Sequence, residues 1–250
     1  MLSIVATPIG NLDDISARAL QVLKEADVIA CEDTRRTRIL LAHFGIPRPA
    51  VFISYRQGNE QSTGDYILRL LDEGRNVAMC SDGGYPGISD PGYRLVSAAA
   101  ERGVEYQVIP GASAVDVALL MSGLPTSSYT FKGYPPRRPG VLRRFFEEEK
   151  DMPHTLIFFE SPFRVGATMS VALDVLGDRR AAVCVELTKK FERVSRGFLK
   201  QLCQEFTGAK VKGEITIVVA GNNKKFLNEE SGDSVSEENS LSESKFSVHL

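Results

Sequence analysis

Short apolar runs alternate with amphipathic stretches along the first half of the chain. Five buried strands are predicted, at residues 2–6, 28–31, 51–53, 77–80 and 106–109. Between them, apolar residues at helical spacing predict helices at about residues 14–26, 34–44, 65–73 and 93–102. Asp14 is the expected cap of the first helix. This alternation favours a largely parallel sheet with right-handed crossovers.

The second half follows a different pattern. Four prolines between residues 123 and 140 predict a connection and a loop. Beyond them, strands are predicted at residues 155–159, 181–185 and 215–220, and helices at 162–176 and 198–206. Few residues separate the later strands, which favours a mixed sheet. The sequence therefore predicts an α/β protein with two domains, residues 1–124 and 125–221.

Composition changes this picture mainly at the end of the chain. Residues 222–250 contain seven serines and carry a net charge of −3, which predicts a disordered, acidic, Ser-rich tail. The whole chain of 250 residues carries a net charge of −2 and is 43% hydrophobic. This composition excludes a collagen-like, coiled-coil or wholly disordered protein, and it argues against nucleic-acid binding by charge alone.

Cysteines and histidines give no sign of a metal centre. The four cysteines lie far apart without a CxxC pair, and the three histidines do not cluster near them. We therefore expect no metal and a reduced, cytoplasmic compartment. The apolar run at the N-terminus is too short for a signal peptide, and no run approaches the roughly 20 residues that a membrane helix needs.

Three loops at predicted strand ends are rich in turn residues, and ligands of open parallel sheets bind at such ends. Residues 6–12 lack a GxGxxG motif and by themselves favour a plain turn. Residues 81–92 hold four glycines and two prolines, which predicts a rigid, ligand-approaching loop. There, Asp82 can accept hydrogen bonds from a ligand, or Asp82 and Asp90 can cap a turn and a helix. Residues 110–114 indicate either ligand-facing N–H groups or close packing.

Charged clusters follow several strands. Glu32 and Asp33 precede three arginines, which indicates helix capping, phosphate binding or a solvated face. Four further arginines, at positions 137, 138, 143 and 144, flank the proline-rich loop and suggest a mobile basic flap. Neither His43 nor His154 forms a recognisable nucleophile–base pair with another residue, so both are interpreted as structural or exposed.

The order of these segments resembles the tetrapyrrole methylase superfamily, and within it the ribosomal RNA small-subunit (cytidine-2′-O-)methyltransferase branch. The matching stretches are residues 5–14, 32–35, 81–82, 86–92, 110–114, 159–162, 186–192 and 213–214. The resemblance implies a two-domain tetrapyrrole-methylase-like fold, a homodimer, and S-adenosylmethionine bound between the domains. By position, the implied cofactor contacts are Pro8, Ile9, Asp82, Gly83, Ile88, Ala112, Ser113, Phe159, Leu187 and Thr216.

The implied reaction is methylation of a ribose 2′-hydroxyl in small-subunit (16S) ribosomal RNA. A ribose hydroxyl is a poor nucleophile and benefits from a positioned base. The acidic candidates are Glu32, Asp33 and Glu160, and we expect Asp33 or Glu32 to take the proton. Arg35 or Lys189 can steady the developing alkoxide. The expected RNA-binding residues are Arg35, Arg36, Arg137, Arg138, Arg164 and Lys189.

The sequence also departs from the family pattern. Residues 56–58 and Phe163 stand where histidines are common, and the acidic tail replaces a helical C-terminal segment. These departures leave two alternatives: a same-fold methylase acting on a small molecule such as a tetrapyrrole, or a catalytically silent RNA- or cofactor-binding relative. A pI near 6.0 predicts that the RNA is recognised within an assembling 30S subunit rather than as a naked strand.

Overall fold

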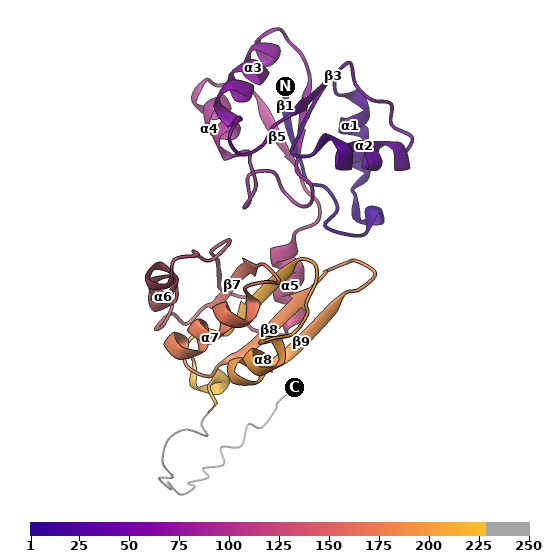
Figure 1. Ribbon diagram of the computed structural model, residues 1–250. Coiled ribbons are helices and arrows are strands. Elements are labelled where there is room, and N and C mark those ends of the chain that lie inside the picture. Colours follow the sequence, from indigo (N-terminus) through magenta and orange to yellow (C-terminus); the bar gives the residue numbers. More distant parts are fainter. Residues whose placement is uncertain (229–250) are drawn as a thin grey trace, which may run out of the picture.

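Two five-stranded sheets form the described part of the chain, residues 1–228 of a computed structural model (Figure 1). The first sheet has the order β3-β2-β4-β1-β5, and its pairings are all parallel, as the sequence predicted. Its strands are β1 Leu2–Val5, β2 Val28–Cys31, β3 Val51–Ser54, β4 Val77–Cys80 and β5 Tyr106–Ile109. Every residue of β1, β2 and β4 is buried, which explains why these strands are continuous apolar runs.

Helices cover both faces of this sheet. α1 (Ala17–Glu25) and α2 (Thr34–His43) pack on one face, and α3 (Glu60–Asp72) and α4 (Tyr93–Glu101) pack on the other. Ser16, whose side chain accepts from the Ala19 N–H, caps α1. The predicted cap, Asp14, lies instead in the short 3-10 helix η1 (Leu12–Asp14). α3 begins five residues before its predicted start at residue 65.

The second sheet is mixed, as predicted, with the order β6-β7-β10-β8-β9. β6 pairs with β7 in parallel, and the remaining pairs are antiparallel. Its strands are β6 Tyr129–Phe131, β7 Thr155–Glu160, β8 Arg180–Val185, β9 Arg193–Phe198 and β10 Ile215–Val219. The sequence pattern missed β6 and β9, which are short or carry alternating polar residues.

Four helices pack against the second sheet. α6 (Pro139–Glu147), α7 (Val165–Leu176) and α8 (Leu199–Phe206) bury their apolar sides on one face, and α5 (Ala114–Ser122) covers the other. The expectation of a mobile basic flap is therefore wrong for residues 139–147. Within α6, Arg143 forms an ion pair with Glu147 at 3.1 Å and another with Asp174.

The packing of α5 bears on where the two units divide. The sequence placed residues 114–122 before a boundary near residue 125, but α5 lies with the second sheet (Figure 1) and packs against β7, β8 and β10. We therefore propose that the division lies at residues 110–113, between β5 and α5. With this division, the buried residues of each hydrophobic core cluster all belong to one unit, as expected for a domain.

The chain remains ordered beyond the second sheet. The expectation of disorder from residue 222 is wrong for residues 222–228, which include the 3-10 helix η2 (Lys224–Phe226). Leu227 forms a backbone bridge with Arg179, and the Asn228 amide donates to Asp178 at 2.8 Å. The remainder of the expected tail, residues 229–250, lies outside the described residues.

Within residues 1–228, no helix combines the length and the apolarity that crossing a membrane requires. In the same part of the chain, no group of three or more His, Cys, Asp or Glu side chains is arranged to hold a metal ion.

Candidate functional site

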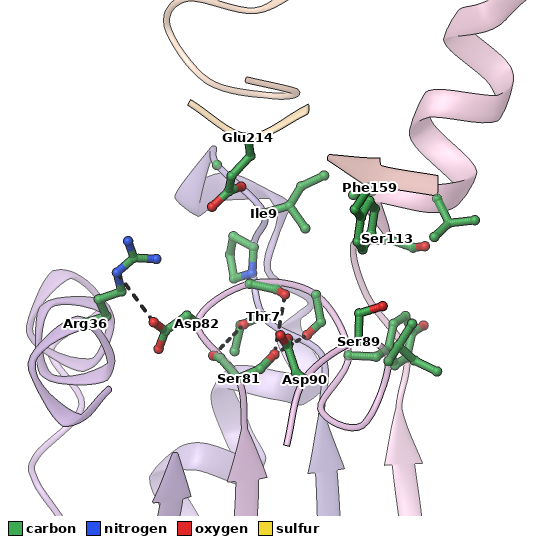
Figure 2. A pocket seen from close by; sticks show the side chains of 18 of the residues that line it. Thr7, Ile9, Arg36, Ser81, Asp82, Ser89, Asp90, Ser113, Phe159 and Glu214 are labelled. Carbon is green, nitrogen blue, oxygen red and sulfur yellow. Dashed lines mark hydrogen bonds and ion pairs between the residues drawn. The ribbon is translucent and has the colours of Figure 1, made fainter. Parts of the chain in front are cut away.

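A cavity of about 470 Å³ lies between the two units, at the carboxyl ends of the first sheet (Figure 2). Its volume falls in the range of about 300–1,000 Å³ that small-molecule pockets occupy. The first unit contributes the loops after β1 and β4 and one side of α2, and the second contributes the start of α5 and residues near β7 and β10. Figure 2 shows Asp82 and Asp90 on the side of the first sheet and Phe159 and Glu214 opposite them.

Backbone hydrogen bonds hold the two loops of the first unit together. Thr7 and Gly84 each donate a backbone N–H to the carbonyl of the other at 2.9 Å. The Thr7 hydroxyl donates to the Ser81 carbonyl at 3.1 Å, and the Ser81 hydroxyl donates to the Gly84 carbonyl at 3.3 Å. A side chain at Gly83 would place its Cβ 3.3 Å from the Pro8 carbonyl oxygen. These contacts explain why small residues are needed where the main chain borders the cavity.

A second set of contacts joins the two units beside the cavity. The Asn11 N–H donates to the Thr188 hydroxyl at 3.1 Å. Gly10 lies so close to the second unit that an added Cβ would be 2.8 Å from the Leu187 carbonyl oxygen. Lys189, which lines the cavity, forms ion pairs with Glu186 at 2.8 Å and with Glu214 at 3.1 Å. The width of the cavity therefore depends on the loop at residues 186–189.

Most of the implied cofactor contacts line this one cavity. These are Pro8, Ile9, Asp82, Gly83, Ile88, Ser113, Phe159 and Thr216. Ala112 and Leu187 are not among the lining residues. Leu187 is buried in the core under α5, and its backbone carbonyl lies close to Gly10, which lines the cavity. The resemblance thus selected residues that are far apart in sequence and share one cavity.

Asp33 has the contacts of a helix cap rather than of a base. Its carboxylate accepts from the Arg35 N–H at 2.8 Å and pairs with the Arg35 guanidinium at 2.6 Å. These interactions with Arg35 hold the pKa of Asp33 far below its ordinary value. Asp33 does not line the cavity, and a carboxylate with so low a pKa is a weak proton acceptor. The prediction that Asp33 takes the proton therefore loses its physical basis.

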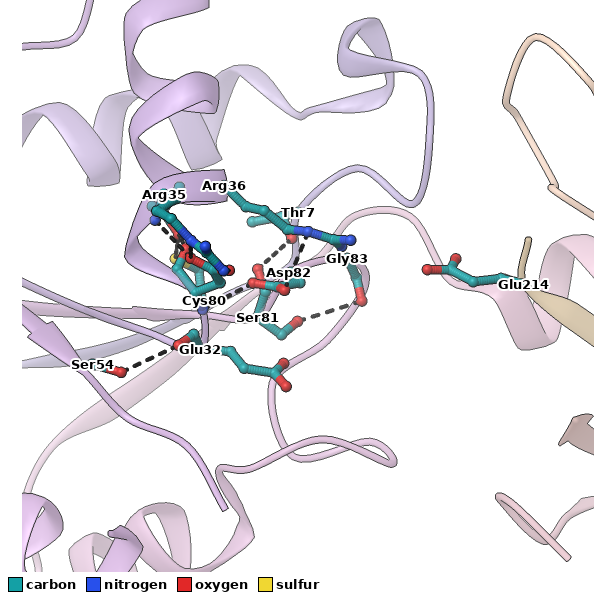
Figure 3. A network of polar contacts seen from close by, with 12 residues as sticks. Thr7, Glu32, Arg35, Arg36, Ser54, Cys80, Ser81, Asp82, Gly83 and Glu214 are labelled. Atoms are coloured by element: carbon teal, nitrogen blue, oxygen red, sulfur yellow. Dashed lines mark hydrogen bonds and ion pairs between the residues drawn. The ribbon is translucent and has the colours of Figure 1, made fainter. Parts of the chain in front are cut away.

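Glu32 lies next to Asp33 but in a different environment. In Figure 3 its carboxylate points away from Arg35, the ion-pair partner of Asp33. Burial, and then the negative charge of Asp82, raise the pKa of Glu32. Glu32 is not among the cavity-lining residues. Its negative charge nevertheless affects the cavity, because it raises the pKa of Asp90.

Glu160 and Arg164 also lie outside the cavity lining. The Glu160 side chain is fully buried, accepts from the Ser161 N–H at 2.7 Å and from the Thr168 hydroxyl, and lies 3.5 Å from the Arg164 guanidinium. Arg164 in turn donates to the carbonyls of Pro135 and Pro136. These contacts give Glu160 and Arg164 a structural role, which differs from the expected base and RNA contact.

The other expected RNA-binding residues lie at the surface. Arg35, Arg36, Arg137 and Arg138 are exposed, and Arg36 also lines the cavity, 3.5 Å from the Asp82 carboxylate. Phe163, which stands where the family pattern has a histidine, is 96% exposed.

The polar cavity residues that the sequence analysis did not name as site residues include Asp90, Tyr134 and Glu214. Asp90 does not cap α4, because Gly92 occupies that position. Burial, and then the charge of Glu32, raise the pKa of Asp90 to about 7. Two of these residues could have been found from the sequence, because they lie in stretches that match the family. Asp90 lies in the matched stretch 86–92, and Glu214 lies in the matched stretch 213–214.

The model of the tetrapyrrole (corrin/porphyrin) methylases matches residues 1–203. The chain is 46% identical to a ribosomal RNA small subunit methyltransferase I of Halalkalibacterium halodurans, over 92% of this chain and 78% of that protein. It is 42% identical to a protein of the same name from Thermotoga maritima, over 88% and 98%. Among solved structures, the cobalamin biosynthetic enzyme cobalt precorrin-4 methyltransferase CbiF is similar with a TM-score of 0.66 and 18% identity, over 88% of this chain and 94% of that one, which supports the fold.

Proposed function

Because the chain belongs to the tetrapyrrole (corrin/porphyrin) methylases, we propose that it transfers a methyl group from S-adenosylmethionine to a cytidine ribose 2′-hydroxyl of small-subunit (16S) ribosomal RNA. The observation that carries this proposal is the high identity to named ribosomal RNA methyltransferases, which extends across both units. The solved cobalamin enzyme shares the fold at much lower identity and gives the small-molecule alternative weaker support.

The residues of the cavity fit this methyl donor. When bound, S-adenosylmethionine supplies a methyl group that is already activated on a positively charged sulfur. The carboxylates of Asp82, Asp90 and Glu214 give the cavity acceptors for hydroxyl and ammonium groups and favour a cationic ligand. Ile9 and Phe159 give it apolar surface for a base. Gly83 and Gly84 have no side chains, so a bound ligand can approach their main chain closely.

The work left to the chain is to align the ribose oxygen and to handle one proton. Lys189 is held at the cavity by Glu186 and Glu214, and its ammonium group can stabilise negative charge developing on the ribose oxygen. Arg36 stands at the cavity on the exposed side of α2, where it can contact a phosphate of an entering RNA segment.

The proposal includes three finer points, which concern the substrate, the compartment and the oligomeric state. The substrate is an assembling 30S subunit in the cytoplasm, because a chain with a pI near 6.0 has little charge attraction for naked RNA. The protein acts as a homodimer. Methylation of purified 30S subunits should exceed methylation of free 16S RNA, and light scattering on the purified protein should give twice the monomer mass.

The test of the function is a map of ribose methylation in 16S RNA from cells with and without the gene. One cytidine 2′-O-methyl group should disappear without the gene and return when it is restored. Purified protein with labelled S-adenosylmethionine should transfer label to 30S subunits from the deficient cells. Label transfer to tetrapyrroles, with no transfer to subunits, would instead support the small-molecule methylase.

Replacing both Arg137 and Arg138 by Ser should weaken substrate binding without slowing turnover. Both side chains are exposed, and they follow the loop whose Tyr134 lines the cavity. We expect KM for 30S subunits to rise about 10-fold, kcat to stay unchanged, and the salt slope of binding to fall by about 2, since each phosphate contact contributes about 1. Steady-state kinetics and binding at several salt concentrations measure this.

Arg143→Ser is the matched control for this pair. Arg143 lies on the following helix but is already paired with Glu147 and Asp174, so its loss should leave KM and the salt slope unchanged. Equal effects of the control and of the double variant would mean that no RNA contact is specific to residues 137 and 138.

A further inference from the structure

We infer that Phe163 is a stacking surface for an unpaired base of the substrate RNA, next to the cytidine whose ribose enters the cavity. This inference rests on the proposed function and deepens it by naming a residue that holds the RNA outside the cavity. The Phe163 side chain is 96% exposed, whereas the next most exposed large hydrophobic residue of the described part of the chain, Phe191, is 74% exposed. The Phe163 ring therefore takes almost no part in the core, and folding alone does not explain it.

The turn after β7 holds Phe163 in a fixed position. The Ser161 carbonyl accepts from the N–H groups of Arg164 and Val165, at 3.0 Å and 3.1 Å, which closes the turn around Phe163. The Arg164 guanidinium lies 3.5 Å from the buried Glu160 carboxylate, so the residue directly after Phe163 is anchored by its side chain as well. The ring is thus presented to solvent by an ordered turn, and binding needs little further ordering of the chain.

The same turn lies beside the mouth of the cavity. Phe159 of β7 lines the cavity and comes four residues before Phe163. Tyr134, in the neighbouring loop, also lines the cavity, and its ring centroid is 5.5 Å from that of Phe159. The Arg164 guanidinium donates to the carbonyl of the next loop residue, Pro135, at 3.1 Å, which fastens the turn to this loop. An RNA strand that delivers a ribose to the cavity continues over this rim, where its adjoining base reaches Phe163.

The charge beside Phe163 favours RNA over a protein partner. In the loop of residues 132–138, the exposed residues are Tyr134, Arg137 and Arg138. Arginines next to an exposed aromatic ring suit a nucleotide chain, because they can hold its phosphates while a base stacks on the ring. The core of a protein interface is instead depleted of charged residues.

Stacking on Phe163 also meets a need of the proposed reaction. A nucleotide whose ribose enters a pocket separates from its neighbours, so the adjoining base loses the stack that it made with the target base. An aromatic ring at the rim replaces this stack and lowers the cost of drawing the cytidine out of the RNA. Such stacking accepts any base, because every base has a π face. Phe163 therefore strengthens RNA binding and takes no part in methyl transfer itself.

The experiment compares wild type with Phe163→Ala on 30S subunits from deficient cells. We expect KM to rise about 10-fold with kcat unchanged, because the stack forms equally in the ground state and in the transition state. The salt slope of binding should stay that of wild type, since the ring carries no charge, whereas loss of Arg137 and Arg138 lowers it. Phe163→Trp should restore KM, and Phe163→Leu, which keeps an apolar side chain without a π face, should not.

The matched control is Tyr66→Ala, which removes a ring that is 40% exposed on α3 and does not line the cavity, so KM should stay that of wild type. Phe163→Ala should keep the wild-type Tm, because its ring buries almost no surface. Calorimetry with S-adenosylhomocysteine should give unchanged affinity, because Phe163 is not among the cavity-lining residues. Photocrosslinking reads the contact directly: p-benzoylphenylalanine at position 163 should crosslink to 16S RNA within a few nucleotides of the methylated cytidine.

Three results would overturn the inference: a wild-type KM in Phe163→Ala, a wild-type KM in Phe163→Leu, or crosslinks from position 163 that reach another protein chain and no RNA. The last result would identify this rim as a protein interface, for example between two copies of this chain. An active wild type together with an unaffected Phe163→Ala rejects the role of Phe163 alone. A wild type that methylates no 30S subunit rejects the proposed function, and the inference with it.

Discussion

Replacing Gly10 by Val should reduce kcat/KM for methyl transfer more than 10²-fold, since displacements of about 1 Å in a catalytic arrangement have effects of about this size. An added Cβ at Gly10 would lie 2.6 Å from the Thr188 hydroxyl oxygen and 2.8 Å from the Leu187 carbonyl oxygen. The loop after β1 and the loop at residues 186–189 would have to separate, which moves Ile9 and Lys189 apart across the cavity. Steady-state kinetics on 30S subunits measures the loss.

The effect of Gly10→Val should appear in binding as well as in turnover. Calorimetry with S-adenosylhomocysteine should show weaker binding, while circular dichroism stays that of the folded protein. Gly140→Ala is the matched control, because no atom lies within 4 Å of a Cβ placed there. Wild-type affinity and turnover in Gly10→Val would show that the two units are not held at a fixed separation beside the cavity.

The strands that the sequence predicted well are those buried on both faces. Residues 28–31 and 77–80 form β2 and β4 with the predicted bounds, because every position is apolar and lies between two layers of helices. β9 (Arg193–Phe198) was missed because it is an edge strand in which only Gly197 is buried. Its place depends on pairing with β8, which a local pattern does not record.

Helix α6 was missed for a different reason. Pro139 was counted among the loop-forming prolines, yet it stands in the first turn of the helix, where proline is favoured. Leu142, Phe145 and Phe146 then form its buried side. The apolar spacing was visible in the sequence, but the prolines before it outweighed it in the prediction.

The candidate site shows the same division between local and non-local information. The resemblance selected eight of the implied cofactor contacts that share the cavity; six lie in turns at the ends of elements, and Phe159 and Thr216 lie in strands β7 and β10. The choice of a proton acceptor failed at Asp33, since the pairing with Arg35 is a side-chain geometry that sequence spacing leaves open. Asp90 gains its environment from Glu32 and Glu214, which come from other strands and approach only in the folded chain.

Replacing Glu160 by Ala should destabilise the protein strongly. Its fully buried carboxylate joins the Ser161 N–H, the Thr168 hydroxyl and Arg164, and Arg164 holds the carbonyls of Pro135 and Pro136. Removing one member of a buried charged network leaves the others unpaired, and the expected loss in free energy of unfolding is about 3 kcal/mol. For a chain of this size that corresponds to a fall in Tm of about 6–12 °C. Urea and thermal unfolding measure both quantities.

The matched control is Glu147→Ala, which removes a carboxylate that is 47% exposed and pairs with Arg143 at 3.1 Å. An exposed ion pair of this kind is worth less than about 1 kcal/mol, because water screens the charges and the side chains lose little on separation. A difference of about 2 kcal/mol or more between the two variants therefore identifies Glu160 as a structural group. If Glu160→Ala instead unfolded like wild type and lost turnover with intact binding of S-adenosylhomocysteine, its carboxylate would belong to the reaction, as the sequence first suggested.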